Sequence, residues 1–412
     1  MKTSSSGAAG SSSRSADKRT SWRTGLLAIS LVLATVGACG CSLSPSSALS
    51  TSDCPNFSGP ITITSGGTYI GCWESPDFGT PAVRISTTEP VVIENSIVRA
   101  PGKKIATTVE GADVTVRDSK GYGLNPNIAG ASTEYFFYSH APKNVRIVNN
   151  YLEGTPGIWV GSYGGNYTPE QTIKVLRNQA LNIDGRRSDG AGGYRNAYQR
   201  LRQFLQLDHV QNVPNVEVGW NEIFNEPGKS GVEDNINIYM SSGTPSSPIN
   251  IHDNYIDGAY PATGIDATFT GGGILGGDGD APTKSEVPAY VRVHHNQVLD
   301  TTNYGVAVAN GHHIELDHNR TVGDSNDYTA RNVGMFCWNG GGHDDNRWNN
   351  NSIHDNKSAW ISDYGGATHR NDYWVPDCHV STNNESLPTV DEAAEWGLWQ
   401  KKLDKNGIVL GP

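Results

Sequence analysis

The stretch VRIVNNYL at residues 145–152 decides the fold. Its leading apolar side chains stand at alternate positions, and an asparagine occupies the sixth position. The same pattern recurs as IKVLRNQA (173–180), VEVGWNEI (216–223), INIHDNYI (249–256), VRVHHNQV (291–298) and IELDHNRT (314–321). Alternation with a period of two is typical of β-strands. Because the asparagine keeps its place, we predict one structural unit repeated along a solenoid.

Weaker copies, VVIENSI (91–97) and VTVRDSK (114–120), extend the series toward the N-terminus. The expected ladder is then Asn95, Asp118, Asn150, Asn178, Asn221, Asn254, Asn296, Asn319 and either Asn351 or Asn356. A second apolar strand precedes most units, as GIWVGS (157–162), FLQLDH (204–209), NINIYM (235–240), GGILGG (272–277), GVAVAN (305–310) and VGMFCW (333–338). We therefore expect about nine or more coils, whose stacked asparagine amides hydrogen-bond along the solenoid.

The repeated unit, over about residues 60–385, resembles the right-handed parallel β-helix superfamily of pectate-lyase-like and polygalacturonase-like proteins. The resemblance implies an all-β domain, which we place at residues 54–385, and carbohydrate chemistry. The turn-rich composition, with 48 glycines in 412 residues, fits that class. In the tail, residues 386–412, Thr389 and Glu392 match a capping box. They predict a helix over 393–405 that ends at Gly407 and packs on an open end or flank of the solenoid.

The first residues are read as a targeting segment rather than fold. A basic leader is followed by the apolar run LLAISLVLATVGA (26–38), which is too short to span a bilayer comfortably. Val36-Gly37-Ala38-Cys39 resembles a bacterial lipobox, which implies cleavage after a signal peptide at 1–38 and a lipid on Cys39. An ordinary secretory signal is the alternative. Residues 39–53 then form a flexible tether, and the protein is expected to be extracytoplasmic, secreted or lipid-anchored.

Charge and cysteines narrow the class of partner. Loss of residues 1–38 would leave 26 basic and 41 acidic residues, a charge of −15, which disfavours nucleic acid. We expect a monomer that meets the membrane only through its lipid. The cysteine spacing does not match a zinc site. In an oxidising compartment, Cys54 with Cys72 and Cys337 with Cys378 are the natural disulfides, one at each end of the solenoid.

The longest insertions carry the candidate binding chemistry. Between ladder positions 178 and 221, five arginines fall within seventeen residues: Arg186, Arg187, Arg195, Arg200 and Arg202. Lys229 follows one coil later. In an acidic protein such a concentration of positive charge indicates an anionic ligand. The alternative is that these arginines pair with local acids and only hold the loop.

The segment GKSGVEDNINIYMSSG (228–243) is the sharpest local signal for catalysis. Lys229, Glu233 and Asp234 precede a strand and Tyr239 leaves it, which gives both acid and base candidates. Neighbouring strand ends add substrate-binding candidates: Asp208, His209, Asp278, His312 and Trp338. Together they suit a sugar-binding groove. Asp278 and Asp280, in GGDGD, also suit Ca²⁺, which prefers oxygen ligands.

Three functions compete. The favoured one is a lyase that cleaves a uronate polysaccharide by β-elimination, with Lys229 as base and Arg200 or Arg202 holding the substrate carboxylate. A C5-epimerase would use similar groups. The second is a polygalacturonase-like hydrolase that uses Asp208, Glu233, Asp234 and Asp278. However, Gly-Gly-Gly-Ile stands where that family's Gly-His-Gly is expected, and no Asn-Thr-Asp-Gly precedes it. The third is a non-enzymatic glycan-binding surface lipoprotein, against which the uneven coil lengths argue.

Overall fold

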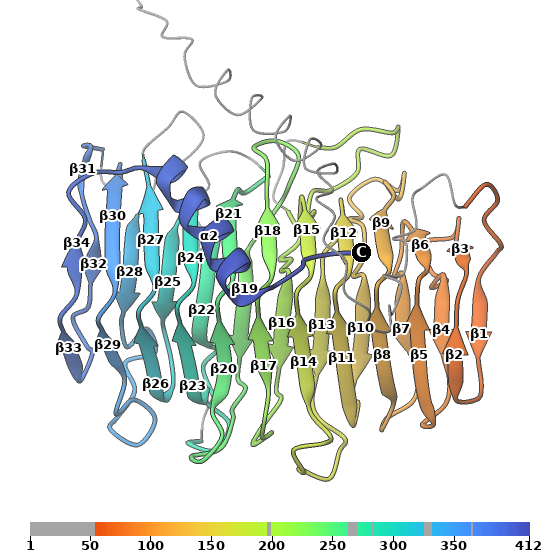
Figure 1. Cartoon of the computed structure of the whole chain (residues 1–412), viewed down its shortest axis with the longest axis horizontal. Helices are drawn as coiled ribbons and strands as arrows, with labels where there is room; N and C mark the ends of the chain where they lie inside the picture. The colour runs from red at the N-terminus through yellow and green to blue at the C-terminus, as the bar shows by residue number, and fades with distance from the viewer. Residues whose placement is uncertain (1–53, 196–198, 263–269, 282, 325–331, 364–365) are drawn as a thin grey trace, which may run out of the picture. The chain divides into compact units, whose positions relative to one another are not determined.

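The computed structural model describes residues 54–195, 199–262, 270–281, 283–324, 332–363 and 366–412. Over these residues each coil contributes one strand to each of three parallel sheets (Figure 1). This is the right-handed parallel β-helix predicted from the repeats. A parallel strand needs a crossover to reach its neighbour, and such crossovers are almost always right-handed.

The sheets are numbered by their first strand, and strands are given in their order across each sheet. Sheet 1 contains β1 (Ile61–Ile63), β4 (Val83–Ile85), β7 (Ile105–Thr107), β10 (Phe137–His140), β13 (Ile158–Gly161), β16 (Leu205–Asp208), β19 (Asp234–Tyr239), β22 (Gly272–Asp278), β25 (Tyr304–Val308), β28 (Val333–Cys337) and β32 (Tyr373–Trp374). Sheet 2 contains β2 (Gly67–Tyr69), β5 (Pro90–Glu94), β8 (Asp113–Arg117), β11 (Asn144–Val148), β14 (Ile173–Leu176), β17 (Glu217–Gly219), β20 (Ile249–His252), β23 (Ala289–His294), β26 (His312–Asp317), β29 (Ser352–His354) and β33 (Val380–Thr382). Sheet 3 contains β3 (Cys72–Glu74), β6 (Ile97–Ala100), β9 (Lys120–Gly123), β12 (Tyr151–Glu153), β15 (Gln179–Leu181), β18 (Glu222–Phe224), β21 (Tyr255–Ala259), β24 (Gln297–Thr301), β27 (Arg320–Gly323), β30 (Lys357–Ser362) and the antiparallel β31 (His369–Arg370), with β34 (Glu385–Ser386) also paired to β30.

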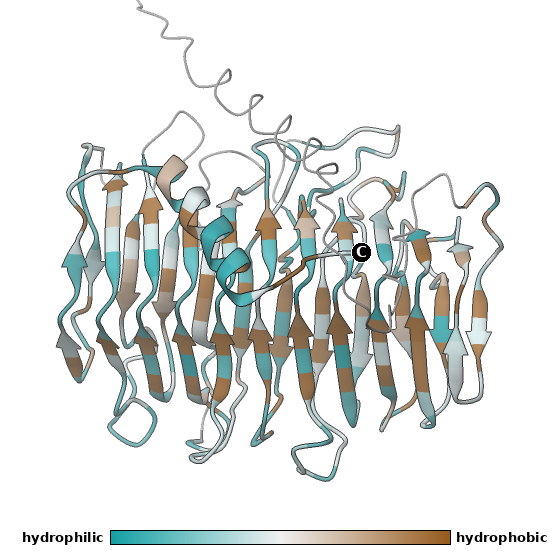
Figure 2. Ribbon diagram, viewed as in Figure 1, coloured by the Kyte–Doolittle hydropathy of each residue, from teal (hydrophilic) through white to brown (hydrophobic). Residues whose placement is uncertain are grey.

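The alternation seen in the sequence fills the inside of the coils. Val145 pairs with Ile173 and Ile147 with Val175 in register, and all four side chains are fully buried. Apolar and polar residues accordingly alternate along many strands (Figure 2). Stacked coils are about 4.8 Å apart, so equivalent side chains pack directly on one another. The core is therefore a narrow column of Ile, Val and Leu.

The asparagine ladder exists, and it corrects two predicted positions. Asn150, Asn178, Asn221, Asn254, Asn296, Asn319, Asn356 and Asn384 pass side-chain hydrogen bonds from coil to coil at 2.8–3.1 Å. The earlier positions are Ser96 and Ser119, not Asn95 and Asp118. Asn95 and Asp118 instead take the preceding left-handed turn, with φ of 44° and 50°. Asn and Asp tolerate that conformation well. Polar residues therefore suit both the left-handed position and the ladder position that follows it, and the prediction was wrong by one residue.

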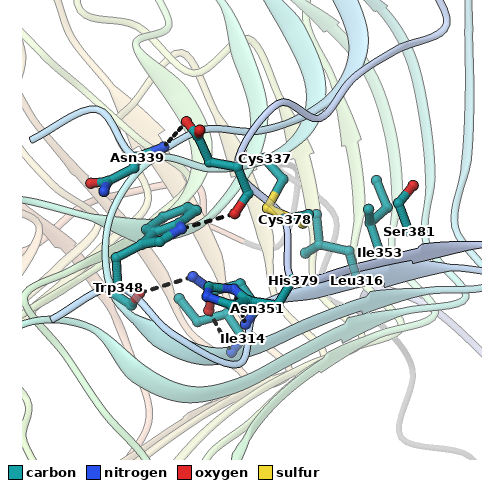
Figure 3. Close-up of a disulfide and its surroundings, with 12 residues drawn as sticks. Ile314, Leu316, Cys337, Asn339, Trp348, Asn351, Ile353, Cys378, His379 and Ser381 are labelled. Carbon is teal, nitrogen blue, oxygen red and sulfur yellow. Dashed lines mark hydrogen bonds between the residues drawn. A yellow bond between two sulfur atoms is a disulfide. The ribbon is translucent and has the colours of Figure 1, made fainter. Parts of the chain in front are cut away.

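Both predicted disulfides are present, with Cα–Cα distances of 5.9 Å for Cys54–Cys72 and 5.5 Å for Cys337–Cys378. The second lies beside Trp348, whose indole nitrogen donates a 2.9 Å hydrogen bond to the Asp377 carbonyl (Figure 3). The two disulfides are consistent with an oxidising compartment.

The tail forms helix α2 (Glu392–Asn406), which lies on the flank of the solenoid against sheet 3 (Figure 1). The Trp399 indole donates a 2.6 Å hydrogen bond to Glu222, and Arg320 pairs with Glu395. Gly407 ends the helix as predicted, with a left-handed φ of 62°, but the N-cap is Asp391 rather than Thr389. The Asp391 carboxylate accepts a hydrogen bond from the backbone amide of Ala394, three residues later, and so caps the helix.

The N-terminal predictions lie outside the described residues. The signal peptide at 1–38, the lipid site at Cys39 and the tether at 39–53 therefore stay predictions. No helix in the described part of the chain is long and apolar enough to span a bilayer.

Candidate functional site

The candidate site lies on the outer face of sheet 1, on strands β13, β16, β19 and β22. Asp208 is in register with Gly161 on one side and with Tyr239 on the other, and Tyr239 pairs with Asp278. The residues that precede these positions along the strands, such as Ile238 before Tyr239, point into the core and are fully buried. Alternation therefore turns this row outward on successive coils, where a long ligand could contact all of it.

Two adjacent acids, Glu233 and Asp234, stand at the start of β19, and Asn237 connects Asp234 to Asp278 of this row. Asp234 is 2% exposed, accepts a hydrogen bond from the Tyr304 hydroxyl and accepts another, 2.8 Å long, from the Asn237 amide. The same Asn237 amide nitrogen donates to Asp278 at 2.9 Å. Glu233 accepts a hydrogen bond from Gln203 on the preceding coil. Asn237 therefore links two carboxyl groups, and the three acids form one cluster.

Burial sets the protonation of the acid pair. Desolvation is the largest cause that raises the pKa of the Glu233 carboxyl, and repulsion from Asp234 and Asp278 raises it further. Burial likewise raises the pKa of Asp234, although the hydrogen bond from Tyr304 opposes this. Carboxyl groups this close cannot all ionise cheaply. The pair therefore retains a proton at pH values where an exposed carboxyl would have lost it.

A histidine and a tyrosine flank the acid cluster on the outer face. The His209 Nδ1 lies 2.5 Å from Asp208 Oδ1, and the imidazole meets the Tyr239 ring edge-on, with centroids 5.7 Å apart. A carboxylate at Nδ1 keeps the proton on that nitrogen and leaves Nε2 as the basic one. Burial, followed by repulsion from Asp278 and Asp208, raises the pKa of Tyr239. The imidazole can accept a proton, and the phenol is held in the form that donates one.

Two of the predicted arginines, Arg202 and Arg186, are paired with acids. Arg202 pairs with Glu134 at 2.8 Å, and its guanidinium lies 4.8 Å from the Tyr135 ring centre. Arg186 pairs with Asp184 at 2.8 Å. The structure therefore favours, for these two arginines, the alternative in which they hold the loop. Arg202 still adjoins the acid cluster, because its carbonyl accepts the Glu233 amide at 2.9 Å.

Arg200 and Lys229 lie on exposed segments. Lys229 is on the turn between β18 and β19, with its ammonium 3.4 Å from Glu226 and its side chain 61% exposed. Arg200 precedes β16, and its backbone amide donates a hydrogen bond to the Gly185 carbonyl. The structure thus brings Arg202, Glu233, Asp234 and Asp278 together, and gives no contact between Lys229 and these acids.

Two other predicted substrate contacts lie apart. His312 begins β26 in sheet 2, is only 3% exposed and packs against His313 and Tyr290. Its predicted place in the groove is therefore wrong, because the chain has already turned into the next sheet. Trp338 follows β28 in sheet 1, two coils beyond β22, where its ring is 5.6 Å from that of Trp374.

The predicted calcium ligands have protein partners. Asp278 accepts hydrogen bonds from Asn237 and from the Gly279 amide, whereas Asp280 pairs with His343 at 3.2 Å. Among the side chains that the structure describes, no three or more His, Cys, Asp or Glu residues converge in a way that suits a metal ion. The calcium site stays a prediction without structural support.

Three residues of the cluster escaped the sequence reasoning. Asn237 could have been found, because it shares the outward face of its strand with Tyr239. Gln203 precedes the strand of the coil before and has no distinguishing sequence signal. Tyr304 is 70 residues from Asp234, and only the stacking of coils brings its hydroxyl to that carboxylate.

Comparisons with known proteins give one weak structural likeness. No protein-family model matches the chain, and no curated protein matches it. Among solved structures, one similar chain is described as a mannuronic acid specific polysaccharide family 6 lyase from human gut microbiota. The identity is 12%, the match covers 86% of this chain and 91% of that one, and the TM-score is 0.33. A likeness of this size is too low for a function to be carried over.

Proposed function

We propose that the protein is an extracytoplasmic polysaccharide lyase that cleaves a uronate-containing polymer by β-elimination on the outer face of sheet 1. The observation that carries this proposal is the contact of His209 with Tyr239, whose phenol lies near Asp278 of the acid cluster. His209 can accept a proton, Tyr239 can donate one, and the acid cluster supplies a carboxyl group that stays neutral. Those are the three tasks of the reaction.

In β-elimination, a base removes the C5 proton of the uronate and the oxygen at C4 leaves. His209 Nε2 takes the proton, and the Asp208 carboxylate stabilises the imidazolium that forms. The C5–H electron pair becomes the C4–C5 double bond as the C4–O bond breaks. Tyr239 gives its proton to the departing oxygen, so the charge balances. Burial raises the pKa of this phenol, which is therefore protonated when the substrate arrives.

The intermediate charge falls on the substrate carboxyl group, which becomes an enediolate. A carboxyl that stays protonated can donate a hydrogen bond to this charge, and such a donor is strongest in a site shielded from water. The Glu233–Asp234 pair is suited to that role, since burial keeps a proton on it. Sharing a proton also lowers the repulsion between the cluster and an anionic substrate.

Glycoside hydrolysis is the second candidate, and the same raised pKa favours it. A protonated Glu233 could protonate the glycosidic oxygen while Asp278 activates water. A C5-epimerase would use His209 and Tyr239 on opposite faces of the same carbon. The proposal of Lys229 as the base remains open to test, but it requires the ammonium to leave Glu226.

The experiment is incubation of the purified protein with alginate and polygalacturonate, with and without a chelator. Absorbance of a new C4–C5 double bond supports a lyase, whereas new reducing ends without it indicate a hydrolase. Binding without either product would indicate a glycan-binding protein. Parallel His209→Ala and Lys229→Ala variants separate the two bases. We expect His209→Ala to lose at least about 100-fold in kcat and Lys229→Ala to keep most activity, and the reverse result would reassign the base.

A further inference from the structure

Two aromatic rings stack on the outer face of sheet 1, on the coils just before His209. Tyr138 of β10 and Trp159 of β13 are in register, with ring centroids 4.4 Å apart and planes 10° from parallel. The Lys103 ammonium lies 4.5 Å from the Tyr138 ring centre. Both rings are only partly buried. The stack is therefore a rigid aromatic surface at the protein exterior, outside the core.

Gly161 determines how the indole lies. A Cβ atom at Gly161 would come within 2.1 Å of the Trp159 Cη2 atom, so the six-membered ring of the indole occupies the space of the missing side chain. Gly161 is in register with Asp208 on the next coil. The indole therefore extends along its own strand to the position that borders the row of Asp208 and Tyr239.

The order of strands says in which direction each face of the indole points. Tyr138 takes the face on the β10 side, and the opposite face points toward β16, which carries Gln206 and Asp208. Gln206 is the in-register neighbour of Trp159 and is partly exposed. A planar apolar surface beside amide and carboxylate groups matches a sugar ring, which presents C–H bonds on its faces and hydroxyls at its edge.

We propose that Trp159, held by Tyr138 and by the absence of a side chain at Gly161, is a subsite that stacks one pyranose ring of the polymer next to the proton-transfer residues. This deepens the proposed function, on which it rests. The Trp159 ring binds the face of the sugar, and Gln206 and Asp208 are the nearest in-register partners for its hydroxyls. Stacking of this kind holds the neighbouring sugar against His209.

The test measures binding separately from cleavage. Calorimetry with alginate and polygalacturonate uses His209→Ala as the common background, so that the polymer stays intact. Trp159→Ala and Gly161→Ala are each expected to raise Kd by about tenfold or more, since a buried aromatic anchor is worth at least that. Gly161→Ala keeps the tryptophan but forces the indole off its position. Tyr122→Ala removes a ring of the Tyr122–Tyr151 pair, which lies on sheet 3, and should leave Kd within about twofold.

The outcomes separate the subsite from the lyase. An unchanged Kd for both Trp159→Ala and Gly161→Ala, or an equal rise for Tyr122→Ala, would overturn the subsite even if the parent protein cleaves the polymer. Failure of the background protein to bind either polymer would also overturn it. Tight binding that depends on Trp159, with no cleavage by the parent, would support the subsite and refute the lyase. Thermal unfolding of each variant verifies that it is folded.

Discussion

Replacement of Glu233 by Gln tests whether the acid pair is held neutral by burial. Gln keeps the shape of the side chain and an oxygen that can accept the hydrogen bond from Gln203. It lacks a proton to lose. The variant should therefore be more stable than the parent at pH 8 and nearly equal to it at pH 4, while its activity falls by at least about 100-fold.

The sign follows from the raised pKa. In the unfolded chain Glu233 ionises near pH 4.3, whereas in the folded protein burial and the carboxyls of Asp234 and Asp278 postpone ionisation to higher pH. Between those two values the folded state holds one more proton, so the free energy of unfolding falls as the pH rises. A buried carboxylate that lacks an ion pair of its own costs on the order of 3 kcal/mol. Glu233→Gln should recover about that amount at pH 8.

Urea denaturation of both proteins at pH 4 and pH 8 provides the measurement, and Glu217→Gln is the matched control. Hydrogen bonds from His252 and then Lys174 lower the pKa of Glu217 to about 2. The stability that Glu217 contributes is present above pH 4.3 and is lost as the pH falls through its folded pKa. Glu217→Gln should therefore destabilise the protein at pH 8. If Glu233→Gln also destabilises at pH 8, the neutral acid pair is refuted.

Three further predictions concern the fold. Asn221→Ala should cost about 2–4 kcal/mol in urea denaturation, because it removes four buried hydrogen bonds, to Asn178, Val175 and Asn254. Asn384→Ala at the partly exposed end should cost less than about 1 kcal/mol, and equal losses would contradict the ladder. Joint replacement of Cys337 and Cys378 by Ser should lower the free energy of unfolding by about 2–4 kcal/mol without reductant, and an unchanged midpoint would mean that the bond does not form. Trp399→Ala should cost about 3–5 kcal/mol and expose the C-terminal tail to protease; an uncut tail would show that the helix is held by other contacts.

The repeats predicted the architecture because their signal is local. Alternation within eight residues determines which side chains of a strand face inward, and the Asn marks the same turn on each coil. The same locality explains the error at Asn95 and Asp118. One residue of that turn needs a left-handed backbone and the next needs a side chain that bonds to its copies, and polar residues satisfy both.

The sequence also directed attention to one segment, and the structure places Glu233, Asp234 and Tyr239 on one strand and its approach. It was misled about His312, because charge and polarity do not reveal where the chain turns from one sheet into the next. Neither could residue type tell that Arg202 is paired with Glu134, an acid 68 residues earlier.

The amino-acid pattern by itself determined the winding of the chain, the disulfide partners and the strand that carries the acids, because each depends on spacing along the chain. Only the tertiary structure decided which acids are buried, which imidazole contacts Tyr239 and which indole borders Asp208. Those properties arise from contacts between coils, such as Tyr304 on Asp234 and Trp159 over Gly161 beside Asp208. Because loop lengths differ from coil to coil, the number of residues between two side chains does not tell whether they lie on neighbouring coils.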